Sequence, residues 1–392
     1  MYITFLIGNG FDLNLGLKTS YKDFLEDYAN KNSNTSDNIM KFKEFIDKKK
    51  DKKEILWVDA EKEFLDYSNE FDGKKATVKD YSQCHLDICS SLGKYLEREE
   101  QKIDFKDEGI DVAFAESISM EHLLSTLPPA EQEILESYSK NIGGGYVYNF
   151  LSFNYTRTVD NFISSIEGKN LLGERKISHY QSQTNAMGKL LHVHGYTDQY
   201  MVFGGNDDAQ IGNISLFEEE PRYKKQFIKR ETNLLYQQGS DNKAYDVLKR
   251  SDLIYIFGMS IGDTDAIWWE RICNLLSEKN NLRVIIHVHK FFEANPAPIE
   301  WCFFMDDFKD QFLRFTNLNN ILKERIKNKI FVTNGNIFKH LENLSNIDYI
   351  EEIKQNRDRK VDEYVGQEYQ LVSNRDIVEN FNRGYSEEIS MS

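Results

Sequence analysis

Short apolar runs, each ended by glycine, asparagine or a polar turn, recur along the chain and predict buried strands. The first run, residues 2–7, is rich in β-branched and aromatic side chains. Helical-looking segments lie between several of the later runs, which is typical of a parallel sheet with helices on both faces. The sequence therefore predicts an α/β fold with a doubly wound, mostly parallel, Rossmann-like sheet. The later runs occupy residues 145–156, 189–195, 251–265, 282–290 and 329–335.

The chain changes character between residues 25 and 143, where charged, helix-forming segments replace the apolar runs. Because this region lacks comparable strand runs, we interpret 25–143 as a helical subdomain inserted into an α/β domain made of residues 1–24 and 144–345. Residues 346–392 are polar, acidic and weakly patterned, and we expect a helical extension there. A further charged helical segment, 218–249, is a candidate lid.

Composition and charge narrow the possible functions. The 392 residues carry a formal net charge of −15, which argues against a broad nucleic-acid surface. The Lys-rich stretch 47–54 is the best candidate for a basic groove, although a solvated helix face is the commoner role. The four cysteines form no CxxC pair, which fits a reducing compartment and excludes a paired-cysteine zinc ribbon. Without a signal-peptide pattern or an apolar stretch of ~20 residues, we expect a cytoplasmic protein that does not span a membrane.

A glycine turn follows the first predicted strand. Gly8 and Gly10 allow unusual backbone angles and close approach of a ligand, and Thr19 or Ser20 would cap the next helix. A strand, a glycine turn and a helix N-terminus favour phosphate binding, because free N–H groups and the helix dipole attract an anion. The spacing is not GxGxxG, since Leu13 stands where the third glycine would be. A tight turn without a ligand is the alternative.

Polar segments gather at the carboxyl ends of the predicted strands, where open α/β sheets bind ligands. In chain order they read GNGFD, FNYT, HVHG, FGGND and FGMSIGDTD. In that order they resemble the sirtuin-like NAD-binding superfamily, and most closely its AbiH branch, the bacteriophage abortive-infection proteins. Gly8, Gly10 and Gly16 match the sirtuin glycine loop GxGxxxxxG, with Asp-Phe a few residues later. The resemblance to AbiH runs through most of the chain.

Three further positions match the family pattern, and two features of this sequence differ from it. Asn154 matches the family's strand-end asparagine, His194 its His-Gly pair and Gly258 its Gly-x-Ser turn. Thr156 stands where sirtuins have aspartate, which changes the surroundings of Asn154. The paired cysteines of the sirtuin zinc module are also missing, which argues against protein deacylation.

The resemblance implies antiphage defence in which NAD is the substrate and is hydrolysed to ADP-ribose and nicotinamide, with no metal. His194 would accept a proton from water or a ribose hydroxyl, and Asn154 would orient that group. A phage-derived activator and an inhibitory lid or homo-oligomeric switch would control the activity. The implied nucleotide-binding residues are Gly8, Asn9, Gly10, Asp12, Gly258, Ser260 and Asp263.

Two other functions stay open. His192 and His194, two positions apart on a predicted strand, share one face and would suit a metal in a nuclease or nucleotide phosphohydrolase. A non-catalytic nucleotide-sensing or partner-binding module is the third interpretation.

Three acidic residues also have ordinary structural roles. Asp263 and Asp265 more often cap the following helix than bind substrate, and Glu61 more often packs with a salt bridge.

Overall fold

The computed structural model describes most of the chain, and the chain divides into two compact units, Met1–Glu342 and Asn343–Ser392. The predicted extension 346–392 lies outside the described residues, as do residues 51–54 of the Lys-rich stretch. The described ranges are 1–30, 36–50, 60–71, 77–106, 109–178, 181–236, 239–289 and 298–345.

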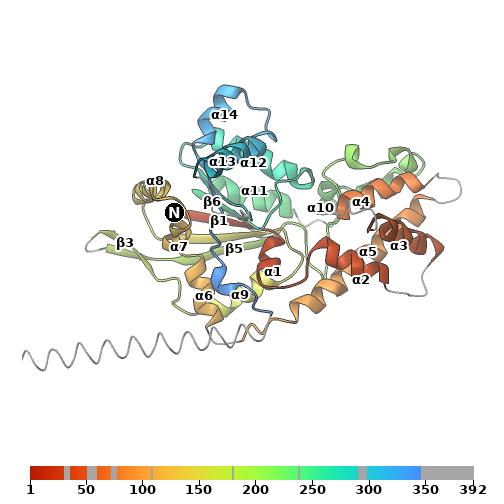
Figure 1. Cartoon of the computed structure of the whole chain (residues 1–392), viewed down its shortest axis with the longest axis horizontal. Helices are drawn as coiled ribbons and strands as arrows, with labels where there is room; N and C mark the ends of the chain where they lie inside the picture. The colour runs from red at the N-terminus through yellow and green to blue at the C-terminus, as the bar shows by residue number, and fades with distance from the viewer. Residues whose placement is uncertain are drawn as a thin grey trace, which may run out of the picture. The chain divides into compact units, whose positions relative to one another are not determined.

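All six predicted apolar runs form strands of one parallel sheet in the first unit (Figure 1). Within the described residues the order across this sheet is β5-β2-β1-β6-β7-β8. Counted along the chain, the third strand is followed by the second, first, fourth, fifth and sixth, which is the Rossmann order. The order reverses between β1 and β6, and ligands of such sheets bind outside the strand ends at that point. The strands are β1 (Tyr2–Ile7), β2 (Val147–Ser152), β5 (Ala186–His192), β6 (Leu253–Phe257), β7 (Arg283–His287) and β8 (Ile330–Thr333).

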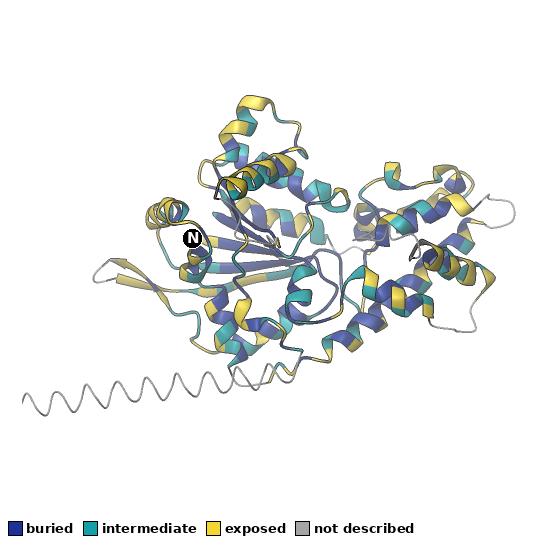
Figure 2. Cartoon of the chain, viewed as in Figure 1, coloured by how far each residue is buried: buried dark blue, intermediate teal, exposed yellow. Residues whose placement is uncertain are grey.

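Helices cover both faces of the sheet, as the predicted doubly wound fold requires (Figures 1 and 2). On one face Phe114 of α6 packs against Phe150 of β2, with ring centroids 5.9 Å apart. On the other face Leu6 and Leu151 share a buried cluster with α11, α12 and α14. The helices are α1 (Gly10–Asn14), α2 (Tyr21–Asn30), α3 (Asp37–Lys50), α4 (Ala60–Tyr67), α5 (Val78–Glu100), α6 (Ile110–Ser117), α7 (Met120–Ser125), α8 (Pro129–Lys140), α9 (Thr158–Ile166), α10 (Lys229–Leu235), α11 (Ser240–Arg250), α12 (Ala266–Glu278), α13 (Pro298–Leu313) and α14 (Asn320–Lys327).

Among the described residues between β1 and β2, every regular element is a helix. Helices α2 to α5 enclose an aromatic core in which Phe64 stacks on Tyr81 with ring centroids 4.8 Å apart. Phe203 and Phe227, which follow β5, are buried in the same core. The inserted helices therefore pack with a second segment of the chain that lies far away in sequence.

Three local features differ from the sequence pattern or sharpen it. Ser20 caps α2, since its Oγ accepts a hydrogen bond from the Asp23 N–H at 3.1 Å. The candidate lid 218–249 is partly a core element, because α11 buries Ala244 against the sheet. A hairpin of β3 (Glu174–Ser178) and β4 (Gln181–Thr184) was not predicted, because its strands are polar and largely exposed.

No helix among the described residues combines the length and apolar character needed to cross a membrane.

Candidate functional site

The glycine turn lies at the switch point of the sheet and packs against the turn that follows β6. Gly8 N–H donates to the Phe257 carbonyl at 2.9 Å, and Gly10 N–H donates to the Gly258 carbonyl at 2.8 Å. A Cβ atom on Gly8 would lie 2.6 Å from the Gly258 oxygen, so both turns need glycine to approach this closely. These two amides are engaged within the protein, and phosphate binding by this loop stays a prediction.

The turn is also tied to the segment that precedes α2. Asn9 Nδ2 donates to the Thr19 carbonyl at 2.8 Å, and the Thr19 hydroxyl donates to Asn9 Oδ1 at 2.7 Å. Gly16 has a φ of 83°, a conformation that favours glycine. The helix that begins at Gly10 has only five residues, and the longer helix α2 starts eleven positions later, at Tyr21. The predicted strand, turn and helix are therefore present, but α2 does not follow the turn directly.

Asp12 places a buried carboxyl group beside the end of β2. The hydroxyls of Thr156 and Thr158 donate to its two oxygens, each at 2.6 Å. Burial raises the pKa of Asp12 to about 6, although both hydroxyls favour the charged form and oppose the shift. Thr156 occupies the position at which the resemblance expects aspartate. Because its hydroxyl binds Asp12, the carboxylate near Asn154 is supplied by the first strand's turn instead.

Asn154 follows β2, and its buried side-chain amide lacks partners with normal hydrogen-bond geometry. Its side chain is buried, with the residue 5% exposed, and neither Nδ2 nor Oδ1 has a hydrogen-bond partner among the described residues. The amide meets no partner with normal hydrogen-bond geometry, but it does act on the Asp12 carboxylate as a weak hydrogen bond, the smallest of the effects that lower the pKa of Asp12. An unpaired buried polar group costs ~1–3 kcal/mol, so an amide in this state indicates a place where a ligand or water binds.

His192 is held by protein groups and orients the turn after β2. Its Nε2 lies 2.8 Å from Asp160 Oδ2 of α9, and its Nδ1 lies 3.0 Å from the Asn154 carbonyl. The strand β5 ends at His192, so the two-residue alternation does not extend to His194, whose partners are different. Across the described residues no three His, Cys, Asp or Glu side chains come together as a metal site.

His194 is buried at the end of β5 against aromatic rings and one carboxylate. Its Nε2 lies 3.4 Å from Asp265 Oδ1, and its ring meets Phe153 edge-on with centroids 5.3 Å apart. Burial, and after it the nearby ammonium of Lys229, lower the pKa of His194 to about 3, although Asp265 and a hydrogen bond with the Phe153 backbone oppose the shift. The imidazole is therefore neutral at pH 7, which is the state a proton acceptor needs, but its basicity is weak.

A group that we call the buried charge cluster surrounds this histidine. It consists of Glu61 of α4, Lys229 of α10, Asp265 just before α12 and His194 two residues after β5. Lys229 Nζ lies 2.8 Å from Glu61 Oε2 and 3.2 Å from Asp265 Oδ1. Tyr155, which follows Asn154, donates its hydroxyl to Glu61 Oε1 at 3.3 Å.

Two members of this cluster depart from the sequence-based interpretation. Asp265 makes no capping hydrogen bond to α12, and its carboxylate faces Lys229 and His194 instead. Glu61 has the predicted salt bridge, yet that bridge connects the inserted helices to the strand ends. Sequence reasoning missed Lys229 because it is one of several cations in a charged stretch, and nothing local shows that it alone is buried.

The remaining predicted residues lie on the loop that follows β6. Gly258 has a φ of 68° and contacts the glycine turn. Ser260 is exposed, and the Asp263 side chain is exposed while lying 3.2 Å from Arg314. The loop therefore brings Gly258 to the switch point, whereas Ser260 and Asp263 face outward, where a ligand could reach them.

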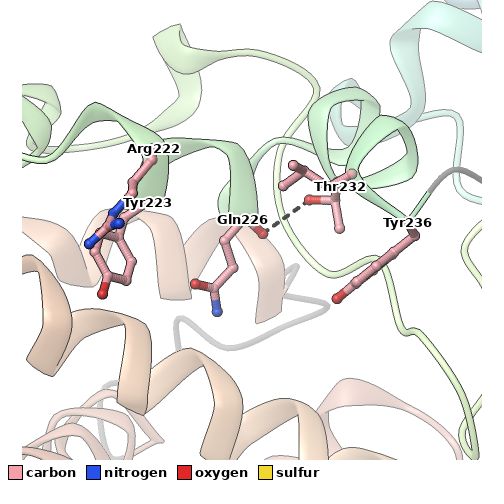
Figure 3. A pocket seen from close by; sticks show the side chains of 6 residues that line it. Arg222, Tyr223, Gln226, Thr232 and Tyr236 are labelled. Carbon is pink, nitrogen blue, oxygen red and sulfur yellow. Dashed lines mark hydrogen bonds between the residues drawn. The ribbon is translucent and has the colours of Figure 1, made fainter.

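Two cavities open among the described residues. One, of about 380 Å³, is lined by Tyr223 and Tyr236 and by residues of the segment between them (Figure 3). None of the predicted site residues lines it. The other, of about 300 Å³, includes Arg157 and Asn161 at the start of α9. Its wall also carries Glu97, Glu100 and Asp198, which do not suit a phosphate group.

Comparison with curated proteins found no match for this chain. Comparison with protein families found one that is described as bacteriophage abortive infection AbiH, and it matches residues 4–287. That region is more than half of the chain and includes the glycine turn, Asn154 and the whole buried charge cluster. The chain therefore belongs to the bacteriophage abortive infection AbiH family.

Proposed function

We propose that this protein acts in abortive infection by hydrolysing NAD to ADP-ribose and nicotinamide at the switch point of its sheet. Membership of the AbiH family assigns the chain to bacteriophage abortive infection. The strand order supports a dinucleotide ligand, since Rossmann sheets bind such ligands at the point where the order reverses. The sirtuin-like character of the site is part of this proposal.

The unpartnered amide of Asn154 is the observation that carries the proposal. It lies at the carboxyl end of β2, next to a buried carboxyl group and near the end of the neighbouring strand β5. An amide has both donors and an acceptor, so it can hold a water molecule or a ribose hydroxyl in one orientation. The Asn154 side chain would thereby place the attacking water next to the anomeric carbon.

The proposed reaction needs one bond to break and one to form. The bond between C1′ of the ribose and the nicotinamide nitrogen breaks, and nicotinamide leaves as a neutral molecule with the electron pair of that bond. A water oxygen then bonds to C1′, and the proton released from that water goes to a protein base. The carboxylate of Asp12 would stabilise the cationic ribose before the water adds.

Asp12 is the better of the two available proton acceptors. A general base works best when its pKa lies near the working pH, and the pKa of Asp12 is raised to about 6. The pKa of His194 is lowered to about 3, so this residue is a poorer base. A neutral His194 would instead accept only a hydrogen bond from a ribose hydroxyl, whereas the resemblance implied that it accepts a proton.

The test is to incubate the purified protein with NAD, with and without extract of phage-infected cells, and to separate the products by chromatography. Asn154→Ala should lower turnover by ~10²–10³-fold, the range for losing a preorganised hydrogen-bonding group in an active site. Asn141→Ala is the matched control, because Asn141 is an exposed residue at the end of α8. Equal turnover by wild type and Asn154→Ala would remove Asn154 from the site, and no product under either condition would contradict NAD hydrolysis.

A further inference from the structure

The buried charge cluster connects the segments that follow β5 and β6 to the inserted helices through Lys229. Lys229 is only 7% exposed, and Glu61, which it contacts, is only 3% exposed. Lys229 Nζ also donates to the Thr264 carbonyl at 3.3 Å, next to Asp265. A lysine that contacts two carboxylates and a carbonyl at this depth is confined to one position, because moving it would leave buried charges unpaired.

Asp265 is the member through which the lysine reaches the histidine. Its Oδ1 lies 3.2 Å from Lys229 Nζ and 3.4 Å from His194 Nε2, so one oxygen faces both groups. Without the Lys229 ammonium, the Asp265 carboxylate would lose the cationic contact described above and would face only the neutral imidazole of His194. The orientation of Asp265 therefore depends on Lys229, and with it one of the two polar contacts of the imidazole, the other being a hydrogen bond with the Phe153 backbone.

We propose that Lys229 is a positioning residue of the site: its ammonium holds Asp265 beside Nε2 of His194, and Glu61 of α4 holds the ammonium. The inserted helices thus contribute Glu61 to the arrangement of the strand ends, which gives the insertion a role in the site. The inference rests on the proposed function only in taking His194 to contact the substrate. The contacts themselves do not depend on the identity of that substrate.

The charges around His194 predict how the site responds when the lysine is removed. The imidazole faces Asp265 just before α12, Lys229 of α10, and the Tyr155 ring and the ring and backbone of Phe153 after β2, with Glu61 of α4 behind Lys229. Lys229 disfavours the protonated imidazole, whereas Asp265 favours it. Replacing the lysine by methionine leaves Asp265 without its cation, so His194 should become easier to protonate.

The test is an NMR titration of the histidine side chains in wild type and Lys229→Met, with His194 assigned from the signal lost in His194→Gln. Wild-type His194 should stay neutral down to the lowest pH at which the protein is folded. In Lys229→Met its midpoint should rise by ~1–3 pH units, the range for the loss of a nearby charge. Lys229→Arg should restore the wild-type behaviour, and Lys225→Met, an exposed lysine of the same segment, should have no effect.

Unchanged titration of His194 in a folded Lys229→Met protein would overturn the positioning role. If Lys229→Met does not fold, the double variant Glu61→Gln/Lys229→Met takes its place, because it also removes the buried charge of Glu61, which Lys229→Met deprives of its ammonium contact. NAD turnover is measured in parallel, and Lys229→Met should lower kcat more than it raises KM. Because the titration does not use NAD, a shifted midpoint without any NAD turnover in wild type would refute the proposed function and leave the link between Lys229 and His194 in place.

Discussion

The ionisation of Asp12 has a consequence for stability that can be worked out from the structure. Burial raises the pKa of this carboxyl group from 3.8 to about 6, so the folded protein binds its proton more tightly than the unfolded chain does. Stability must then fall as the pH rises through this interval, because ionisation favours the unfolded state. The full difference of about two pKa units corresponds to ~3 kcal/mol, of which ~1.5 kcal/mol is lost between pH 5 and pH 7.5.

Asp12→Asn removes the ionisable group and with it this penalty. Asparagine keeps one oxygen for the hydroxyls of Thr156 and Thr158, which now donate to the two oxygens of Asp12, and it offers an N–H₂ group in place of the other. We expect the variant to be more stable than wild type at pH 7.5 by ~1–2 kcal/mol, since part of the gain is offset by weaker hydrogen bonds. NAD turnover should fall by ~10²–10⁴-fold if Asp12 is the base.

The assay is denaturant or thermal unfolding of both proteins at pH 5 and pH 7.5. The decisive quantity is the difference in unfolding free energy between variant and wild type, since the other titrating groups contribute equally to both. This difference should be more favourable to Asp12→Asn at pH 7.5 than at pH 5. The reasoning would be refuted by a difference that stays constant with pH, or by one that favours wild type more at pH 7.5.

Two further predictions concern the glycine turn and metals. Gly10→Ala should destabilise the protein by ~1–3 kcal/mol, because the added Cβ would meet the backbone of Gly258. Gly143→Ala is the control and should melt at the wild-type temperature, because its Cβ would meet nothing within 4 Å. Equal melting temperatures for the two variants would show that the turns do not pack as described. NAD hydrolysis should be unaffected by EDTA, and a loss of activity that Mg²⁺ restores would instead favour the metal-dependent alternative.

The sheet could be predicted from the sequence because its strands are buried on both faces. Such strands appear as continuous apolar runs, and the runs at 2–7 and 329–335 coincide with β1 and β8 to within two residues at either end. The hairpin β3–β4 could not be predicted in the same way, since its exposed polar residues carry no burial pattern. Local periodicity also could not show that Phe203 and Phe227 complete the core of the inserted helices.

Only some residues of the candidate site could be predicted from the sequence. Asn154 and the glycines could be predicted as site residues because strand-end positions in an α/β sheet are informative on their own. Lys229 was not found, because its burial results from pairing with Glu61 and Asp265, which come from distant segments. The closeness of Thr156 to Asp12 likewise becomes visible only when β1 and β2 lie side by side.

The most direct test of the central claim is the NAD content of cells during phage infection. Cells that carry the wild-type protein should lose NAD and accumulate ADP-ribose and nicotinamide after infection, and cells that carry Asn154→Ala at the same protein level should not. If wild-type cells resist the phage while their NAD content stays equal to that of the Asn154→Ala cells, then NAD hydrolysis is not how this protein acts.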